Sequence, residues 1–133
     1  MIGQQKEVQK LKLLHKELTG TIRQTAFEVH KYFGPGFAEK VYENSLANRL
    51  RKKSVIVEQQ VLVRVYDEDG TIVGEYVADL LLEKIVIVEL KAVSALTDQH
   101  FSQLLNYLKA TEIKVGLLIN FGTSKLQVRR FVT

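Results

Sequence analysis

Cysteine is absent from this chain of 133 residues, and proline occurs once. The lack of cysteine excludes disulfide bonds and metal sites built on thiolates, and it leaves the redox compartment unspecified. No apolar run approaches the roughly 18 residues of a membrane-spanning helix. The N-terminus lacks the charged-then-apolar pattern of a signal peptide. The sequence therefore predicts a cytoplasmic protein that does not enter a membrane.

The composition is that of a globular and slightly basic protein. Hydrophobic residues make up 46% of the chain and charged residues 26%, and 133 residues suit one domain with one core. We expect a single domain over residues 1–133, with 1–17 as an N-terminal helical extension. The net charge of +4 permits a polyanionic partner such as nucleic acid but does not require one.

The first half of the chain has the apolar spacing of helices. Apolar residues recur with helical periodicity over 8–18 and 22–33, which indicates one broken helix or a short leader helix followed by a second. The GPG sequence at 34–36 ends this region, because proline lacks the amide hydrogen that a continuing helix needs. A further helix is predicted over 37–53, and its apolar stripe comprises Tyr42, Leu46 and Leu50.

The second half is rich in β-branched residues. DEDG at 67–70 predicts a hairpin turn, and Thr97 suits the N-cap of a helix over 98–110. Strands are predicted at 55–66, 71–82, 85–93, 114–122 and 125–131, the last of them at a sheet edge. The order α-α-β-β-β-α-β-β predicts an α/β fold in which a mixed sheet is flanked by helices.

Three charged residues interrupt two of the most apolar strands. Side chains alternate between the faces of a strand, so Glu89 and Lys91 point the same way. If the two strands form a hairpin centred near Lys84, Asp79 lies beside Glu89. The alternative is a structural ion pair that joins Lys91 to either carboxylate. The IVIV sequence at 85–88, apolar on both faces, favours a central strand with a ligand site at its end.

Two neighbouring carboxylates favour a divalent cation. Their charges repel each other, and one carboxyl would hold a proton in the absence of a cation. Mg²⁺ takes oxygen ligands and commonly uses one or two carboxylates, waters and a substrate phosphate. A metal of this kind can promote hydrolysis of a phosphodiester, and Lys91 would add a fixed positive charge for the attacking water or the reacting phosphate.

Two helices supply further candidates. His100, Gln103 and Tyr107 share one face of the helix at 98–110, next to a core contact made by Leu104, Leu105 and Leu108. For His100 a half-exposed helix edge is the preferred interpretation, whereas Gln103 and Tyr107 are placed to reach Lys91 or a phosphate. Glu39 lies in the first turn of its helix, where the helix dipole also favours a carboxylate, and Glu43 follows one turn later.

Basic residues gather at the other end of the helix that carries Glu39. They suit the helix dipole there, and they equally suit contacts with a phosphate backbone. The candidates for nucleic-acid binding are Arg49, Arg51, Lys52 and Lys53.

Taken together, these residues resemble a known family. GFAEKVY at 36–42 matches the motif of the GxxExxY proteins, small members of the PD-(D/E)XK nuclease superfamily. The resemblance continues over roughly residues 18–131, through ENSLANRL, Asp79, ELKAV, QLLNYLKAT and VGLLINFG. It implies a restriction-endonuclease-like core, a mixed β-sheet flanked by α-helices, with a site for metal-dependent phosphodiester cleavage.

The resemblance also implies roles for single residues. Asp79 and Glu89 would bind Mg²⁺ or Mn²⁺ together with the backbone carbonyl of Leu90, and Glu39 would join them directly or through water. Lys91 would complete the E-x-K motif, and Gln103 and Tyr107 resemble the Q-x-x-x-Y motif of recombination-type nucleases. Ala78 stands where the superfamily name has proline, which is not a ligand.

Two functions follow from this pattern. The first is a nuclease that acts on nucleic acid, for which we expect DNA. The second is a non-catalytic nucleic-acid-binding or regulatory module on the same fold. A domain of this size has little surface for holding a duplex, so a homodimer or another partner would supply the rest.

Overall fold

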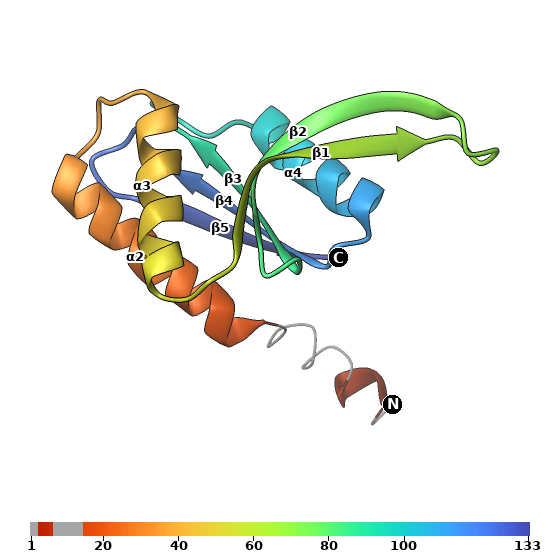
Figure 1. Cartoon of the computed structure of the whole chain (residues 1–133), viewed down its shortest axis with the longest axis horizontal. Coiled ribbons are helices and arrows are strands. Elements are labelled where there is room, and N and C mark those ends of the chain that lie inside the picture. Colours follow the sequence, from red (N-terminus) through yellow and green to blue (C-terminus); the bar gives the residue numbers. More distant parts are fainter. Residues whose placement is uncertain (1–2, 7–14) are drawn as a thin grey trace.

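The computed structural model describes residues 3–6 and 15–133, so the predicted apolar repeat over 8–14 lies outside the described residues. The sheet has five strands, and Figure 1 shows helices on both of its sides. The helices are α2 (Lys16–Phe33), α3 (Glu39–Lys52) and α4 (Asp98–Thr111). The strands are β1 (Val57–Tyr66), β2 (Ile72–Leu82), β3 (Val86–Lys91), β4 (Val115–Asn120) and β5 (Gln127–Val132). From α2 onward this is the predicted order of elements.

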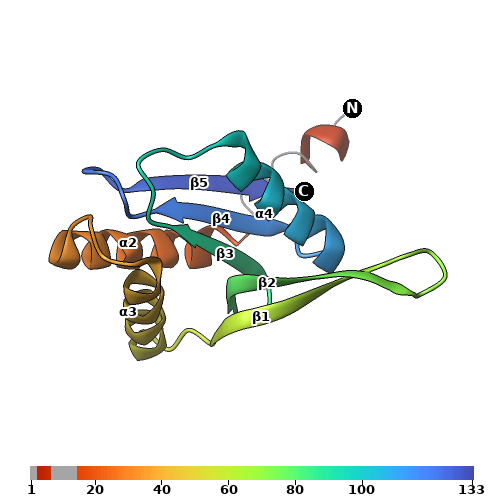
Figure 2. The same cartoon turned by 90° about the horizontal axis from the view of Figure 1, so that it is seen from above.

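The sheet is mixed, as predicted. The strands lie in the order β1-β2-β3-β4-β5, and only β3 and β4 are parallel. The parallel pair is possible because α4 forms the crossover between them (Figure 2). β3 is the central strand and β5 lies at an edge, which confirms both expectations.

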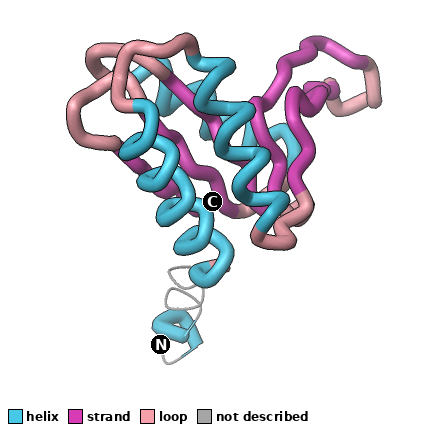
Figure 3. The backbone as a smooth tube through the Cα atoms, turned by 60° about the vertical axis from the view of Figure 1, so that its left-hand side comes forward, coloured by secondary structure: helices cyan, strands magenta, loops and turns pink. Residues whose placement is uncertain are grey.

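Helices cover both faces of the sheet and enclose two apolar cores. α2 and α3 lie side by side on one face (Figure 3), where Ile22, Leu46 and Leu50 pack against even-numbered residues of β3 such as Val88. α4 covers the other face, where Leu104 and Leu108 pack with Ile87. Strand alternation therefore directs Glu89 and Lys91, which follow Ile87 at intervals of two, toward the α4 face.

The β1–β2 hairpin separates from the rest of the sheet. β2 pairs with β3 only from Leu82–Val86 to Leu80–Val88, whereas β1 and β2 remain paired out to Tyr66–Ile72. The hairpin then extends past α4 as a long arm (Figure 1). Asp79 is the first residue of β2 beyond the pairing with β3, so it lies where the two strands diverge.

Some predicted boundaries are wrong. Ile85 belongs to the tight turn formed by Glu83 and Lys84, which both have positive φ angles. The strand predicted to end at residue 93 ends at Lys91. Leu105 is 39% exposed instead of contacting the core, because it lies about 100° around the helix from the fully buried Leu104. In the part of the chain that is described, no helix has the length and apolar character needed to cross a membrane.

Candidate active site

Asp79 and Glu89 are joined at the fork between β2 and β3. The Asp79 backbone N–H donates to Glu89 Oε1 over 2.9 Å, and the Leu90 N–H donates to Asp79 Oδ2 over 2.8 Å. The diverging strands leave these two amides without ladder partners, and the carboxylates satisfy them. The predicted proximity of Asp79 and Glu89 is therefore confirmed.

Lys91 makes no ion-pair contact with these carboxylates. Its Nζ makes a long hydrogen bond of 3.5 Å to Gln103 Oε1 on α4. Among the ion pairs of the described residues, none includes Lys91, Asp79 or Glu89. The alternative expectation of a structural ion pair is thus wrong in this geometry, and Glu89 remains 4% exposed without a cation in contact.

Burial and mutual repulsion favour protonated carboxyls at this fork. Burial raises the pKa of Glu89 to about 8, and the Asp79 charge adds to the rise, while the Asp79 amide and Lys91 oppose it. Burial likewise raises the pKa of Asp79, against the hydrogen bond from Leu90. Glu39 lies at the surface, but the surrounding protein and then the Asp79 charge raise its pKa too. The Asp79 charge therefore acts on both Glu39 and Glu89 and makes each of them harder to ionise.

The GxxExxY sequence positions Glu39 through a turn at residues 34–37 that the Tyr42 hydroxyl holds by hydrogen bonds. Gly36 has a φ of 117°, a conformation that favours glycine. The Tyr42 hydroxyl donates to Gly34 O over 2.5 Å and accepts from the Phe37 N–H over 3.1 Å. The fully buried Tyr42 ring stacks on Phe121, with centroids 4.7 Å apart. The turn is fixed at both ends, and Glu39 begins α3 directly after it.

A second polar cluster borders the fork, and sequence reasoning gave it no role. Glu43 is 3% exposed and accepts hydrogen bonds from Gln59 Nε2 at 2.7 Å, Gln60 Nε2 at 2.6 Å and Lys40 Nζ at 3.0 Å. Gln60 also reaches Asp79 Oδ1 at 3.4 Å. The Gln60 φ of 55° is left-handed within a strand, which costs of order 1–3 kcal/mol. The strained Gln60 thus connects α3 to Asp79.

The predicted α4 face meets Lys91, although not in every detail. Gln103 binds Lys91 through its carbonyl as expected, but its amide donates to the Tyr107 hydroxyl over 2.9 Å. That hydroxyl donates to Val77 O over 3.3 Å, and the side chain is 3% exposed within the α4 core. Burial, followed by the Glu89 charge, raises the pKa of Tyr107. His100 Nδ1 accepts the Thr97 N–H at 3.1 Å and caps α4, which confirms Thr97 as the helix start.

Asn120 fixes the chain that follows Lys91. Its Oδ1 accepts the Val93 and Gly122 N–H groups at 3.0 Å each, and its Nδ2 donates to Val93 O at 3.0 Å. A Cβ added at Gly122 would lie 2.4 Å from the Val93 backbone, so only glycine fits this approach. Buried Asn120 therefore holds the loop where the predicted strand would have continued. In the sequence, the position of Asn120 as a polar residue at the end of an apolar strand could have indicated this role.

The basic end of α3 is the opposite end of the helix from Glu39. α3 has 14 residues, and a helix of that length spans about 20 Å. Arg51 donates to Val57 O at 2.8 Å, Lys53 pairs with Glu28 at 2.9 Å, and Arg49 lies 5.6 Å from the Tyr32 ring centre. The structure does not place this predicted binding group at the fork, and Arg51 approaches the acidic residues only through Gln59, which also binds Glu43.

The fork suits a hard cation held by few protein ligands. No group of three or more His, Cys, Asp or Glu side chains in the described part of the chain is arranged to hold a metal alone. Mg²⁺ ordinarily relies on one or two carboxylates and completes its shell with waters and phosphate. Asp79 and Glu89 are two such carboxylates, without a cation in contact. The Leu90 carbonyl lies on the same side of the strand as its amide, toward Asp79.

Comparison with known proteins agrees with this arrangement. A family model described as the PD-(D/E)XK nuclease superfamily matches residues 16–131, and the chain belongs to this superfamily. The search of curated proteins found no significant match. Among solved structures, the crystal structure of SSO0001 is similar, with a TM-score of 0.51 and 19% identity over 70% of this chain. This chain spans about half, 48%, of the length of that protein, and the likeness concerns the fold alone.

Proposed function

We propose that this protein is a divalent-metal-dependent nuclease that hydrolyses phosphodiester bonds in DNA, of the GxxExxY type within its superfamily. The observation that carries the proposal is the crosswise contact of Asp79 and Glu89 at the end of a central strand, without a neutralising cation. A merely structural site would pair these charges, because uncompensated buried carboxylates reduce stability.

The Asp79 and Glu89 carboxylates and the Leu90 carbonyl would hold Mg²⁺ or Mn²⁺. The bound metal would supply Lewis-acid polarisation of the phosphodiester and a more acidic water. The Asp79 and Glu89 carboxylates are kept in place by the hydrogen bonds that they accept from the backbone amides of Leu90 and Asp79. Glu39, at the surface beside them, would bind the same site directly or orient a water there.

Lys91 would act on the substrate. Its ammonium makes no close ion pair with a described carboxylate, although its charge lowers the pKa of Glu89, and Gln103 holds it through a single long bond. In this position it would bind a phosphate oxygen and stabilise the charge that develops during attack by water. Tyr107 orients Gln103 through its hydroxyl, so its role in the proposed reaction is positioning.

The test is cleavage of labelled single- and double-stranded DNA and RNA, with Mn²⁺ and with EDTA. We expect DNA to be cleaved only when the metal is present. Lys91→Ala should abolish this cleavage and should leave the melting temperature close to the parent's. Lys84→Ala is the matched control, since Lys84 is an exposed lysine of the β2–β3 turn that pairs with Glu58 at 3.0 Å.

Two outcomes would contradict the proposal. Cleavage that persists in EDTA would remove the metal from the mechanism. Full activity of Lys91→Ala would remove Lys91 from it. Binding of nucleic acid without any cleavage would favour the alternative of a non-catalytic module.

A further inference from the structure

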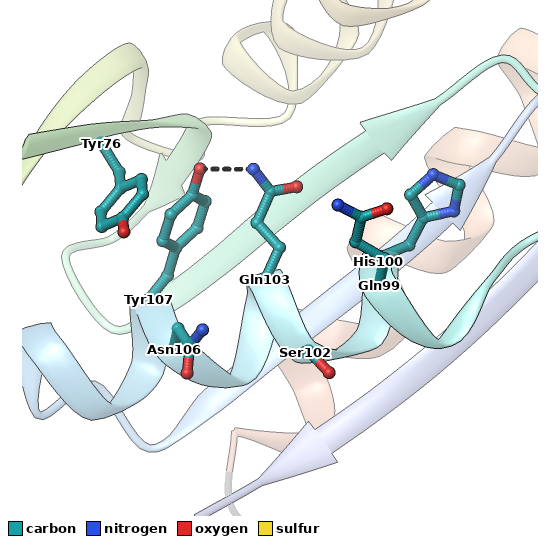
Figure 4. A pocket seen from close by; sticks show the side chains of 7 residues that line it. All are labelled: Tyr76, Gln99, His100, Ser102, Gln103, Asn106 and Tyr107. Atoms are coloured by element: carbon teal, nitrogen blue, oxygen red, sulfur yellow. Dashed lines mark hydrogen bonds between the residues drawn. The ribbon is translucent and has the colours of Figure 1, made fainter.

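A hollow beside the proposed catalytic residues has no part in the metal chemistry. It lies between α4 and β2 and has a volume of about 460 Å³ (Figure 4). Tyr76 from β2 closes one end, and Gln99 and His100 lie at the other. Gln103 also lines it, and the same side chain binds Lys91. A group held in this hollow would therefore lie next to whatever Lys91 binds.

The lining of the hollow is polar but contains no Lys, Arg, Asp or Glu. Gln99, Ser102 and Asn106 form one stripe on α4, at spacings of three and four residues, next to the stripe of His100, Gln103 and Tyr107. Amide side chains both donate and accept hydrogen bonds. Because no Lys or Arg lines the hollow, it offers a phosphate no fixed positive charge and suits a neutral group with donors and acceptors.

Tyr76 adds an open aromatic surface. It is 47% exposed, and its ring centre lies 5.7 Å from that of Tyr107 with the planes tilted by 50°. Nearly half of the Tyr76 side chain is therefore open to solvent beside Tyr107. Aromatic side chains in such positions stack on the bases of single-stranded nucleic acid.

The surface continues along α4 toward the tip of the hairpin. A second hollow of about 420 Å³ shares Tyr76 and Asn106 with the first and adds Tyr66 and Lys109. Tyr66 is 56% exposed, so a second aromatic ring follows the first along the hairpin. Lys109 adds a cation where the strand's phosphates would continue. Aromatic rings for bases, beside a cation for the backbone, are the pattern of single-strand binding.

We propose that this groove binds unpaired bases of the strand whose phosphate lies at Lys91, with the first base stacked on Tyr76 and hydrogen-bonded by the amides of α4. The inference rests on the proposed function, because it names the form of substrate that the catalytic site receives. It gives the nuclease a requirement for a single-stranded segment next to the cleaved bond.

Binding without cleavage tests the groove directly. Fluorescence anisotropy in EDTA compares a labelled single-stranded DNA with an abasic strand of the same length, which keeps the phosphates but lacks the bases. We expect the parent to bind the strand with bases about 10-fold more tightly, the effect of stacking one base. A duplex DNA of equal sequence completes the set, to test the need for unpaired bases.

Three variants assign the effect to Tyr76. Tyr76→Ala should lose the preference for bases, and Tyr76→Phe should keep it, because the ring does the stacking. Phe27→Ala is the matched control, since Phe27 is also 47% exposed but lies on α2, across the sheet from the groove. Melting temperatures check that all variants are folded.

The outcomes separate this inference from the proposed function. Equal binding of the abasic strand by the parent, tighter binding of duplex than of single strand, or unchanged binding by Tyr76→Ala would overturn the groove. Metal-dependent cleavage by the parent in the same preparation would then leave the nuclease standing. Tyr76-dependent binding without cleavage would support the groove and reject the nuclease.

Discussion

The two ends of α3 carry charges of opposite sign, and they differ in how those charges are satisfied. At the C-terminal end, the Arg51 guanidinium donates to Val57 O at 2.8 Å and Gln59 Oε1 at 3.1 Å, and Lys53 pairs with Glu28. Beside the N-terminal end, Glu43 pairs with Lys40, but Asp79 has no ion-pair partner among the described residues. Burial raises the pKa of both Asp79 and Glu39, and the Asp79 charge raises that of Glu39 further.

The difference separates charges that serve the fold from charges that reduce its stability. A charged group with a partner inside the protein contributes to stability, whereas a buried group without one costs stability. Proteins accept such costs at functional sites, where activity requires an arrangement that is not optimal for the fold. Asp79 and Glu89, which lie beside the acidic end and have no ion-pair partner among the described residues, are therefore the place to look for function. At the basic end, Arg51 and Lys53 are bound within the structure.

Gln59 connects the two ends. Its carbonyl accepts from Arg51, and its amide donates to Glu43 at 2.7 Å and to Asn44 at 2.9 Å. One neutral side chain on β1 thus serves the basic and the acidic part of the same helix. Because Arg51 and Lys53 have partners and the fork carboxylates have no ion-pair partner among the described residues, substitutions at the two places should still have opposite effects on stability and on activity.

The largest effect is expected at Glu89. Glu89→Gln removes a charge but keeps an oxygen that can accept the Asp79 amide. We expect cleavage to fall by about 1000-fold or more, while the melting temperature at pH 8 in EDTA rises, because the repulsion with Asp79 is gone. Cleavage assays and thermal unfolding measure the two quantities on one preparation.

The basic end supplies the opposite control. Arg51→Gln should retain cleavage but lose about 1–2 kcal/mol of stability, since it removes charged hydrogen bonds to Val57 and Gln59. A lower melting temperature for Glu89→Gln, or loss of cleavage in folded Arg51→Gln, would contradict the division between the two ends.

A smaller effect is expected at the strained residue Gln60. Gln60→Gly loses the bonds to Glu43 and Asp79 but relieves the left-handed φ of 55°. These contributions oppose each other, so the melting temperature should change little, while cleavage should fall by about 10- to 100-fold as Asp79 loses a positioning bond.

Gln60→Ala is the companion variant, because it loses the same bonds and keeps the strain. It should be less stable than Gln60→Gly by about 1 kcal/mol, the cost of a left-handed non-glycine residue. Parent-like cleavage by both variants would show that Gln60 does not position Asp79.

The acidic end should also make stability depend on pH. Burial and the Asp79 charge raise the pKa of Glu89 from 4.5 to about 8, so between these values the folded protein holds a proton that the unfolded chain has lost. Stability is then fully present below the lower value and is lost as the pH rises toward the upper one. In EDTA we expect the parent to melt at least about 5 °C lower at pH 9 than at pH 5.

Glu89→Gln isolates this contribution, since the other titrating groups remain. The difference in melting temperature between the parent and the variant should widen as the pH rises. A constant difference over that range would show that Glu89 titrates normally in the folded protein.

The sequence contains enough to predict the centre of the site. Strand alternation and the turn at Lys84 bring Asp79 to Glu89, and helical spacing brings Gln103 to Lys91, because both depend on short-range geometry. The crossover by α4 and the mixed sheet follow from the order of elements. These features are local or set by topology, so a single sequence is sufficient to predict them.

The supporting residues could not be found in the same way. Nothing in the sequence marks Gln60 for a left-handed conformation within a strand, and its partner Glu43 lies on another element. Asn120 acts on Val93 across the parallel strand pair, a contact that exists only once the chain is folded. The Tyr107 hydroxyl binds Gln103 and Val77 because α4 packs close to the hairpin.

The smallest expected effect concerns the predicted binding role of Arg49, Arg51, Lys52 and Lys53, which stays a prediction. Lys52 differs from the others, because it is exposed and makes no ion pair or side-chain hydrogen bond with any described residue. A phosphate backbone at this end would meet Lys52 without displacing an internal partner. Lys52→Gln should then reduce the slope of log affinity against log salt for DNA by about one unit. Anisotropy titrations in EDTA measure the slope, and Lys84→Gln, which removes an exposed lysine on another element, should leave it unchanged. An unaltered slope for Lys52→Gln would leave the basic end of α3 with the structural role that its internal contacts already show.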